Sequence, residues 1–270
     1  MNFGIIIIGD EILSGRREDK HLAKTIALFA ERGLSLAYAD YVGDVPERIT
    51  ATLRRAFASG DVVFSFGGIG ATPDDHTRQC ATAALQTELR LHPQAKALIQ
   101  ERMQDIAQEK GLPFEPDRED NLQRLNMGMF PAGARIIPNP YNKIPGFSCE
   151  GAEGGAVHFV PGFPVMAWPM VAWVLDRHYP NHFRRGALQE RSVIVLGAME
   201  AALTPLMERI EHQHPVKVFS LPSVDHPSYG RHIDLGVKGA PAAVQAAFAD
   251  LLAALKGMDL VLGPELVRSI

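Results

Sequence analysis

The sequence is poor in cysteine, in long apolar runs and in blocks of one charge. Its 270 residues include two cysteines, Cys80 and Cys149, and no Cys-x-x-Cys pair, which excludes a disulfide framework and is typical of a reducing cytosol. No stretch reaches the roughly 18 consecutive apolar residues of a membrane helix. The apolar start, Met1 to Ile8, is too short for a signal peptide and lacks its basic flank. We therefore expect a cytoplasmic protein with no membrane partner.

The charges are dispersed along the chain. The net charge is −4 and no basic run is present, so nucleic acid is not an expected partner. Hydrophobic residues make up 46% of the chain, which is sufficient for a large core in one big domain or in two.

The first third of the chain alternates apolar strands with helices. Phe3 to Ile8 is a continuous apolar run typical of a buried parallel strand, and Leu34 to Val42 and Asp61 to Phe64 predict two more strands. Helical spacing follows each of them, at 22–30, 46–57 and 78–87. This order predicts parallel strands joined by right-handed crossovers.

A glycine-rich turn joins the third predicted strand to its helix. Gly67, Gly68 and Gly70 allow backbone conformations and a close approach that other residues do not. Ligands of open α/β sheets bind beyond the carboxyl ends of the strands, and the free N–H groups of a helix N-terminus suit a phosphate. The turn is therefore predicted to hold a phosphate.

A purely structural interpretation of the same stretch also stands. Thr72 can be the N-cap of the helix, Pro73 its first residue and Asp75 the reciprocal partner in a capping box, with Asp74 complementing the helix dipole. Both interpretations can hold together. Two carboxylates beside a phosphate would repel it, so the functional interpretation needs a divalent cation between them or a carboxylate that polarises a nucleophile.

Two more acidic turns follow predicted strands. Asp10 and Glu11 come directly after the first strand, and Asp44 follows the second. Each of these turns could cap a helix. Because the carboxyl ends of parallel strands meet at one edge of a sheet, the acidic turns together predict a shared site there.

The rest of the sequence is less regular. Residues 88–130 are predicted to be largely helical, and short strands are expected at 136–137 and 157–160. The proline-rich loop between them, 138–147, is either a connector or a pocket wall. A stretch rich in His, Arg and Pro, 176–190, is typical of a linker. We expect two domains, 1–180 and 188–270, the second of them a small α+β unit.

Several of these motifs occur together and in the same order in one known family. The chain resembles the N-terminal region of the competence/damage-inducible CinA proteins, a molybdopterin-binding domain of the MoaB/Mog type, over residues 1 to about 180. The stretches that carry the resemblance are Gly9–Gly15, Val42–Asp44, Gly67–Thr77, Asn139–Pro140, Pro145–Phe147 and Pro161–Pro164.

The resemblance implies a fold and a site. The fold would be a three-layer α/β/α sandwich with a mostly parallel sheet, in a homo-oligomer. The ligand would be molybdopterin or a nucleotide, held by its phosphate. Asp75 and Asp44 would be catalytic and would hold a divalent metal (Mg, Mn or Co). Ligand-binding roles would fall to Asp10, Glu11, Gly67, Gly68, Gly70, Thr72, Asp74, Pro145 and Gly146.

The resemblance also implies an activity, the metal-dependent hydrolysis of a pyrophosphate bond in an ADP-ribose-like dinucleotide. CinA proteins often carry a further amidase domain that acts on a nicotinamide nucleotide. This sequence ends before such a domain, so we expect the amidase activity to be absent.

The chain departs from the family pattern along the predicted pocket wall. Ala71 stands where the family usually has proline, and Asn142, Lys143 and Ile144 replace the family's Gly-Thr-Ala. Val165-Met166 stands where the family usually has Glu-Met, so no acidic residue follows Pro164. These departures motivate an alternative function, a module that binds a pterin or nucleotide without turning it over.

Overall fold

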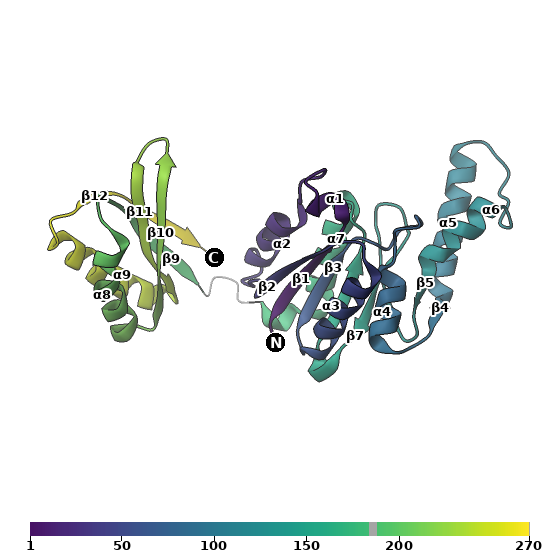
Figure 1. Ribbon diagram of the computed structural model, residues 1–270, viewed down its shortest axis with the longest axis horizontal. Helices are drawn as coiled ribbons and strands as arrows, with labels where there is room; N and C mark the ends of the chain where they lie inside the picture. The colour runs from purple at the N-terminus through teal and green to yellow at the C-terminus, as the bar shows by residue number, and fades with distance from the viewer. Residues whose placement is uncertain (184–187, 270) are drawn as a thin grey trace. The chain divides into compact units, whose positions relative to one another are not determined.

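The computed structural model describes residues 1–183 and 188–269. The chain forms two compact units, residues 1–29 with 35–181 and residues 30–34 with the chain from 182 onward. Each unit has its own sheet (Figure 1).

The first unit is built on a six-stranded sheet in the order β2-β1-β3-β8-β7-β6. The first four strands run parallel, and β7 is antiparallel to both of its neighbours, which confirms the mostly parallel sheet. β1, β3 and β8 are buried throughout, as is typical of parallel strands covered on both faces. The strands are β1 (Phe3–Ile8), β2 (Tyr38–Val42), β3 (Val62–Phe66), β6 (Arg135–Ile137), β7 (Gly146–Glu150) and β8 (Ala156–Val160).

Helices cover both faces of this sheet. Alternate side chains of β1 point to opposite faces, so Ile6 and Ile8 join the core beneath α3 and α4. On the other face Phe3 packs edge-on against Phe29 of α2 at 5.3 Å and against Tyr179, just after α7, at 5.7 Å. This confirms the predicted three-layer fold (Figure 1). The helices are α2 (His21–Ala30), α3 (Pro46–Ala58), α4 (Thr77–Leu85) and α7 (Pro164–His178).

The segment 88–130 is helical over much of its length, as predicted, but its two ends are strands. β4 (Leu89–Leu91) and β5 (Met129–Pro131) pair antiparallel on either side of α5 (Pro93–Glu109) and α6 (Glu119–Leu125). A short helix, α1 (Asp10–Leu13), follows β1. None of the described helices has both the length and the apolar character needed to cross a membrane.

The loop predicted at 138–147 is shorter than expected because an unpredicted strand, β7, begins at Gly146. The strand contains a buried polar residue, Ser148, whose hydroxyl lies 2.7 Å from Nδ1 of His158 on β8. This hydrogen bond satisfies a side chain that sequence patterns place in loops. β2 is also shorter than predicted and begins at Tyr38.

The second unit has an α+β fold, as predicted. Its sheet, in the order β10-β11-β9-β12, is antiparallel and packs one face on two helices through an apolar core. Its elements are β9 (Gln189–Leu196), α8 (Glu200–Gln213), β10 (Val216–His226), β11 (Gly230–Gly239), α9 (Pro241–Lys256) and β12 (Val261–Ser269).

The predicted linker, 176–190, overlaps ordered elements at both ends. α7 runs to His178, a 3₁₀ turn covers Pro180–His182, and β9 begins at Gln189. Residues 184–187 of the predicted linker lie outside the described residues.

Candidate ligand-binding site

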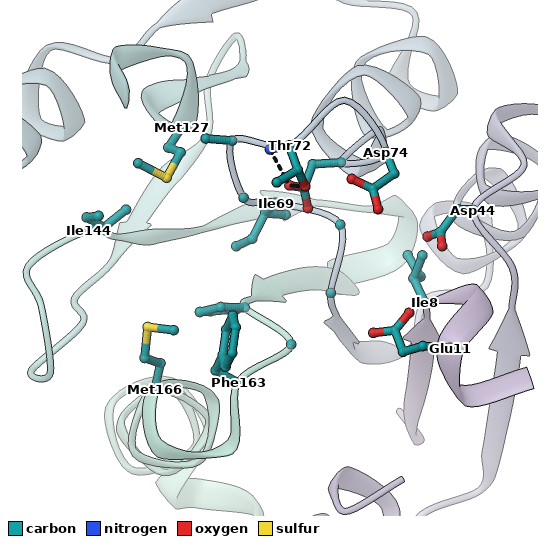
Figure 2. A pocket seen from close by; sticks show the side chains of 18 of the residues that line it. Ile8, Glu11, Asp44, Ile69, Thr72, Asp74, Met127, Ile144, Phe163 and Met166 are labelled. Atoms are coloured by element: carbon teal, nitrogen blue, oxygen red, sulfur yellow. Dashed lines mark hydrogen bonds between the residues drawn. The ribbon is translucent and has the colours of Figure 1, made fainter. Parts of the chain in front are cut away.

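A cavity of about 400 Å³ lies beyond the carboxyl ends of the central strands. Its walls include Ile8 at the end of β1, the glycine loop that follows β3 and the turn Pro161–Phe163 that follows β8. The glycine loop, residues 67–75, forms one wall of the cavity (Figure 2). This is the edge of the sheet at which open α/β proteins bind ligands.

The glycine loop is held from behind through three successive carbonyl groups. Thr77 donates from its hydroxyl to the carbonyl of Gly67 at 3.1 Å and from its main-chain N–H to that of Gly68 at 3.0 Å. Arg78 donates from Nη1 to the carbonyl of Ile69. In a trans peptide the C=O and the next N–H point in opposite directions. The three N–H groups that follow these carbonyls therefore point toward the front of the loop.

These N–H groups are unused within the protein. In the part of the chain that the structure describes, the main-chain N–H groups of Gly68, Ile69 and Gly70 donate no hydrogen bond. All three residues line the cavity. Consecutive outward N–H groups form a concave receptor for an anion, so the glycine loop has the geometry of a phosphate site.

Two of the glycines cannot be replaced without moving the loop. Gly67 has φ 96° and a Cβ there would collide with the carbonyl oxygen of Ile8. Gly68 has φ 67° and its Cβ would collide with Oγ1 of Thr77. A positive φ and a close backbone approach are the conditions in which glycine is required.

Thr72 and Asp75 are joined by hydrogen bonds within the glycine loop. The capping box that the sequence predicts for these two residues is only partly right. Oδ2 of Asp75 accepts from the N–H of Thr72 at 2.8 Å and from its hydroxyl at 2.5 Å. However, α4 begins at Thr77 with His76 as its N-cap, so Thr72 does not cap this helix. The first N–H of α4 is bonded to Gly68, and Thr77 is absent from the cavity wall. The loop, rather than the helix end, faces the cavity.

Acidic side chains lie at one end of the cavity. Glu11, Asp44 and Asp74 are grouped on the same side of the glycine loop (Figure 2). Burial raises the pKa of Asp44, and the negative charges of Asp10, Glu11 and Asp74 raise it further. The hydroxyl of Thr72 lowers the pKa of Asp74. A carboxylate held among others of like charge favours a cation nearby.

Asp44 and Asp10 connect the turns after β2 and β1. Oδ2 of Asp44 accepts from the N–H of Asp10 at 2.8 Å, and Oδ1 of Asp10 accepts from the N–H of Asp44 at 3.1 Å. Of the two roles expected for Asp44, a helix cap or an acidic group at the sheet edge, the cap is wrong, because the N-cap of α3 is Val45 and no side chain caps it. The reciprocal pair instead fixes the position of Asp44 at the cavity.

The opposite end of the cavity is apolar. Its side chains come from the glycine loop, the segment before β5, the loop before β7 and the start of α7 (Figure 2). They are Ile69, Met127, Ile144, Phe163 and Met166. A cavity with an apolar end, an acidic end and a row of free N–H groups between them suits a ligand that joins a flat ring to a phosphate.

The wall loop, residues 138–145, is fixed from two directions. Inside it, Nδ2 of Asn139 donates to the carbonyl of Ile144 at 2.9 Å. Outside it, Nζ of Lys143 lies 2.7 Å from Glu101 and 2.6 Å from Asp105 on α5. The loop that departs from the family pattern is therefore tied to a helix by this lysine.

The fold of the first unit has relatives among known proteins. A family model described as a probable molybdopterin binding domain matches residues 4–180. The chain belongs to this family.

Individual relatives of this molybdopterin-binding domain differ in length. A protein of Pyrobaculum calidifontis is 32% identical over 264 residues, which is 93% of this chain and 95% of that protein. A CinA-like protein of Gloeobacter violaceus is 32% identical over 208 residues, which is 76% of this chain but 46% of that protein. The chain thus matches less than half of the latter relative. A solved structure, CinA of unknown function from Thermoplasma acidophilum, shares 27% identity and a TM-score of 0.54, and covers 65% of this chain and 96% of that one.

Most of the residues predicted for the site of this molybdopterin-binding domain do line the cavity. They are Glu11, Asp44, Gly67, Gly68, Gly70, Thr72, Asp74, Asp75 and Pro145. Asp10 lies behind Asp44 and outside the cavity wall. Gly146 is also outside it, and a Cβ there would collide with the carbonyl of Phe159, so this glycine serves the packing of β7 on β8.

Several residues of the site went unpredicted. Arg17 and Phe163 line the cavity, with the guanidinium carbon 6.0 Å from the ring centroid. Arg78 is only 3% exposed and supports the loop from behind. Burial lowers the pKa of Arg78, although an arginine remains charged in proteins.

The predicted metal site needs ligands that the described residues do not supply by themselves. Among them, no group of three or more His, Cys, Asp or Glu side chains is placed to hold a metal ion. Oδ2 of Asp75 is already engaged by Thr72, and Asp44 is bonded to the main chain of Asp10. The side chains of the cavity therefore do not form a metal site made of protein alone.

Proposed function

We propose that this domain binds a pterin or a nucleotide, with the phosphate on the glycine loop and the ring at the apolar end of the cavity. The observation that carries the proposal is the row of free N–H groups at Gly68, Ile69 and Gly70, fixed from behind and facing the cavity. Family membership supports a pterin, and the geometry suits either ligand class.

A matched pair of substitutions at Ala71 tests this proposal. Ala71 lines the cavity beside the free N–H groups and its side chain is exposed, so either substitution fits without repacking. Ala71→Glu adds a negative charge next to the phosphate, whereas Ala71→Gln adds a neutral side chain of the same shape. We expect titration calorimetry with molybdopterin, AMP and ADP-ribose to give a dissociation constant about tenfold higher for Ala71→Glu than for Ala71→Gln, about 1.4 kcal/mol. Added salt should reduce the difference between the two dissociation constants, because it screens the introduced charge.

The outcomes of this test are distinct. Equal affinities of the two variants for every ligand would place the phosphate elsewhere. No binding of any of these ligands by the unmodified protein, measured also as an absence of ligand-induced thermal stabilisation, would contradict the proposal as a whole.

A second candidate function is hydrolysis of a pyrophosphate bond in an ADP-ribose-like dinucleotide. The grouping of Asp44 and Asp74 at the acidic end of the cavity favours it. Mg²⁺ is commonly held by one or two carboxylates together with substrate phosphates, so Mg, Mn or Co would enter with the ligand. In the reaction, the oxygen of a water molecule would bond to one phosphorus, the bond from that phosphorus to the bridging oxygen would break, and the bridging oxygen would leave on the second phosphate. One of the two water protons would pass to solvent or to a carboxylate. We assign Asp75 and Asp44 to this chemistry, as the family resemblance implies.

A chromatographic assay separates the two functions. The protein is incubated with ADP-ribose, FAD, NAD or ATP and with Mg²⁺, Mn²⁺ or Co²⁺. Release of AMP that is lost in Asp75→Ala and in Asp44→Asn would establish the hydrolase. Binding without any product across this panel would establish a binding module without turnover.

Two predictions about partners complete the proposal. Homo-oligomerisation is implied by the family resemblance, and sedimentation equilibrium measures it. The charge balance predicts no nucleic-acid binding, which a filter-binding assay at low salt would contradict if it retained DNA or RNA.

A further inference from the structure

The cavity beside the glycine loop contains a cationic side chain that the proposed function does not use. Its acidic side chains are Glu11, Asp44, Asp74 and Asp75. Among the described residues that line this cavity, Arg17 alone has a positively charged side chain, and an arginine keeps its charge in proteins. Arg17 is therefore the side chain of the wall that attracts any negative charge a ligand carries beyond the phosphate on the loop.

The main chain of Arg17 is fixed, but the donors of its guanidinium are not committed. The N–H of Arg17 donates to the carbonyl of Glu11 at 3.0 Å, which ties the residue to the turn after β1. Nη1 lies 3.6 Å from Oε1 of Glu11, a distance too long for a hydrogen bond. A guanidinium has five N–H donors in a planar fork, and this one can turn them to a ligand without breaking a hydrogen bond to Glu11.

Two neighbours keep this guanidinium beside the cavity. Its central carbon lies 6.0 Å from the ring centroid of Phe163, a contact of the cation–π kind, and Nη1 faces Glu11 as described. Both neighbours line the cavity (Figure 2). The side chain of Arg17 is 57% exposed, so a ligand in the cavity can reach it.

The turn that carries Phe163 is next to the start of the glycine loop. A Cβ on Gly162 would lie 3.5 Å from Cα of Gly67, so the two backbones are nearly in contact. Gly67 directly precedes Gly68, the first residue of the row of free N–H groups. Phe163, with Arg17 against its ring, therefore lies beside the end of this row that is nearer to β3.

We infer that Arg17 binds a second phosphate of the ligand, next to the phosphate on the glycine loop, and so makes the domain selective for ligands with two linked phosphates over ligands with one. The inference rests on the proposed function, because it takes the first phosphate to be on the loop. The planar fork of arginine matches phosphate oxygens with two parallel hydrogen bonds. Arg17 is then a specificity-determining residue, and the ligand class is a dinucleotide or a nucleoside diphosphate.

The test compares AMP with α,β-methylene-ADP in the full chain. The two probes share the base, the ribose and the first phosphorus, and the bridging carbon of the second probe prevents hydrolysis. With Mg²⁺ at one fixed concentration, we expect titration calorimetry to show that the unmodified protein binds α,β-methylene-ADP about tenfold more tightly than AMP.

Substitutions of Arg17 should change the affinity for one probe only. Arg17→Met keeps an apolar stem against Phe163 but has neither the charge nor the donors, and should reduce the preference for α,β-methylene-ADP about fivefold with the affinity for AMP within about twofold. Arg17→Lys should be intermediate, because it keeps the charge without the planar fork.

Arg16→Met is the matched control. Arg16 is the preceding residue, is exposed and is absent from the cavity wall, so its substitution makes the same change in net charge without touching the site. It should leave both affinities unchanged. As a second measurement, the ³¹P resonance of the terminal phosphorus of bound α,β-methylene-ADP should differ between the unmodified protein and Arg17→Met, and should be the same in the unmodified protein and Arg16→Met.

The possible failures are distinguishable. If the two probes bind the unmodified protein equally well, or if Arg17→Met weakens both to the same degree, Arg17 does not select a second phosphate and the inference is wrong while the phosphate site stands. An equal effect of Arg16→Met and Arg17→Met, or an unchanged ³¹P resonance in Arg17→Met, would also overturn it. If neither probe binds the unmodified protein, the proposed function fails and the inference falls with it.

Discussion

Asp75 holds Thr72 through a single carboxylate oxygen, which accepts both the main-chain N–H at 2.8 Å and the hydroxyl at 2.5 Å. This pair closes the glycine loop at the end opposite to the strand. The other oxygen of Asp75, Oδ1, takes no part in the pair, which leaves it available to a ligand or to a cation that accompanies one.

Asp75 can act in two ways, by holding Thr72 or by contacting the ligand or its cation. Removing each partner of the pair in turn distinguishes these two roles. Asp75→Ala removes two charge-assisted hydrogen bonds, each worth about 1.5–3 kcal/mol when fully formed, and we expect at least a tenfold loss of affinity for a phosphate ligand. Thr72→Val removes only the hydroxyl bond and should cost about threefold. A silent Thr72→Val beside a severe Asp75→Ala would mean that Asp75 acts on the ligand directly or through the main-chain N–H of residue 72, and not through the hydroxyl. Calorimetry measures both.

The buried guanidinium of Arg78 should affect ligand binding more than folding. Arg78→Met keeps the length and apolar stem but releases the carbonyl of Ile69, so the loop can rotate one N–H away from the phosphate. We expect affinity for AMP to fall about tenfold, and Tm to change by only a few degrees, about 2–4 °C per kcal/mol for a domain of this size. Arg78→Lys should be intermediate, because it keeps the charge.

The control for Arg78 is Arg90→Met. Arg90 is exposed on β4 and pairs with Glu88, away from the cavity. It should leave AMP affinity unchanged. If Arg78→Met and Arg90→Met bind AMP equally well, the loop does not depend on the support that Arg78 gives it from behind.

The raised pKa of Asp44 predicts that this residue lowers the stability of the folded protein by an amount that depends on pH. Its folded-state pKa lies above the ordinary value because of burial and of three neighbouring carboxylates. The ionised form is thus disfavoured in the folded protein, and the wild type gains stability as the pH falls through the window between the raised pKa and the ordinary value, about 3.9. Asp44→Asn should therefore raise Tm at pH 7. The difference in Tm between this variant and the wild type should decrease toward pH 4.

Calorimetric unfolding between pH 4 and pH 8 measures this gap. Asp117→Asn makes the same change in net charge at an exposed position away from the cavity and serves as the control. A gap for Asp44→Asn that widens as the pH falls would have the wrong sign and would contradict the assignment. A gain in stability from losing Asp44 would also indicate that the residue is kept for its function.

The ion pairs between Lys143 and α5 should limit the mobility of the wall loop. Lys143→Met removes the contacts with Glu101 and Asp105, and we expect faster amide hydrogen exchange over residues 139–145. Because these ion pairs are exposed, added salt should weaken them and increase amide hydrogen exchange of the loop in the wild type, though less than Lys143→Met does. Lys110→Met, at the end of the same helix, should not change exchange in this loop. Unchanged exchange in Lys143→Met would show that the hydrogen bonds of Asn139 and Asn142 hold the wall without the lysine.

The parts of the fold that the sequence predicts are those governed by local patterns. The apolar runs of β1 and β3, the glycine loop and the position of Pro46 at the start of α3 each follow from short-range chemistry. β7 could not be predicted in this way. Its buried Ser148 is satisfied only by His158, a residue ten positions away on the paired strand, and its register depends on that pairing.

The same distinction applies to the site. Carboxylates at strand ends are visible in a sequence because strand ends are predictable, and Asp44, Asp74 and Asp75 do line the cavity. Arg78 is not visible, because it bonds a main-chain carbonyl, and a carbonyl has no residue type to recognise. Arg78 also lies within a helical pattern that would be the same with any good helix former.

The glycine loop is fixed only when β8 is in place, and a growing chain can bind a ligand in this cavity only after that point. The cavity wall extends from Ile8 to Met166, and Gly67 is fixed by its N–H bond to the carbonyl of Val160 at 3.1 Å. A nascent chain that has emerged to about residue 100 can form β1, β2 and β3, but its glycine loop has no β8 to close on. A ligand that needs the complete cavity would not stabilise these early strands by mass action, because the cavity has not yet formed. Ligand supply in the cell would therefore change how long the finished domain survives and not how quickly its first half folds.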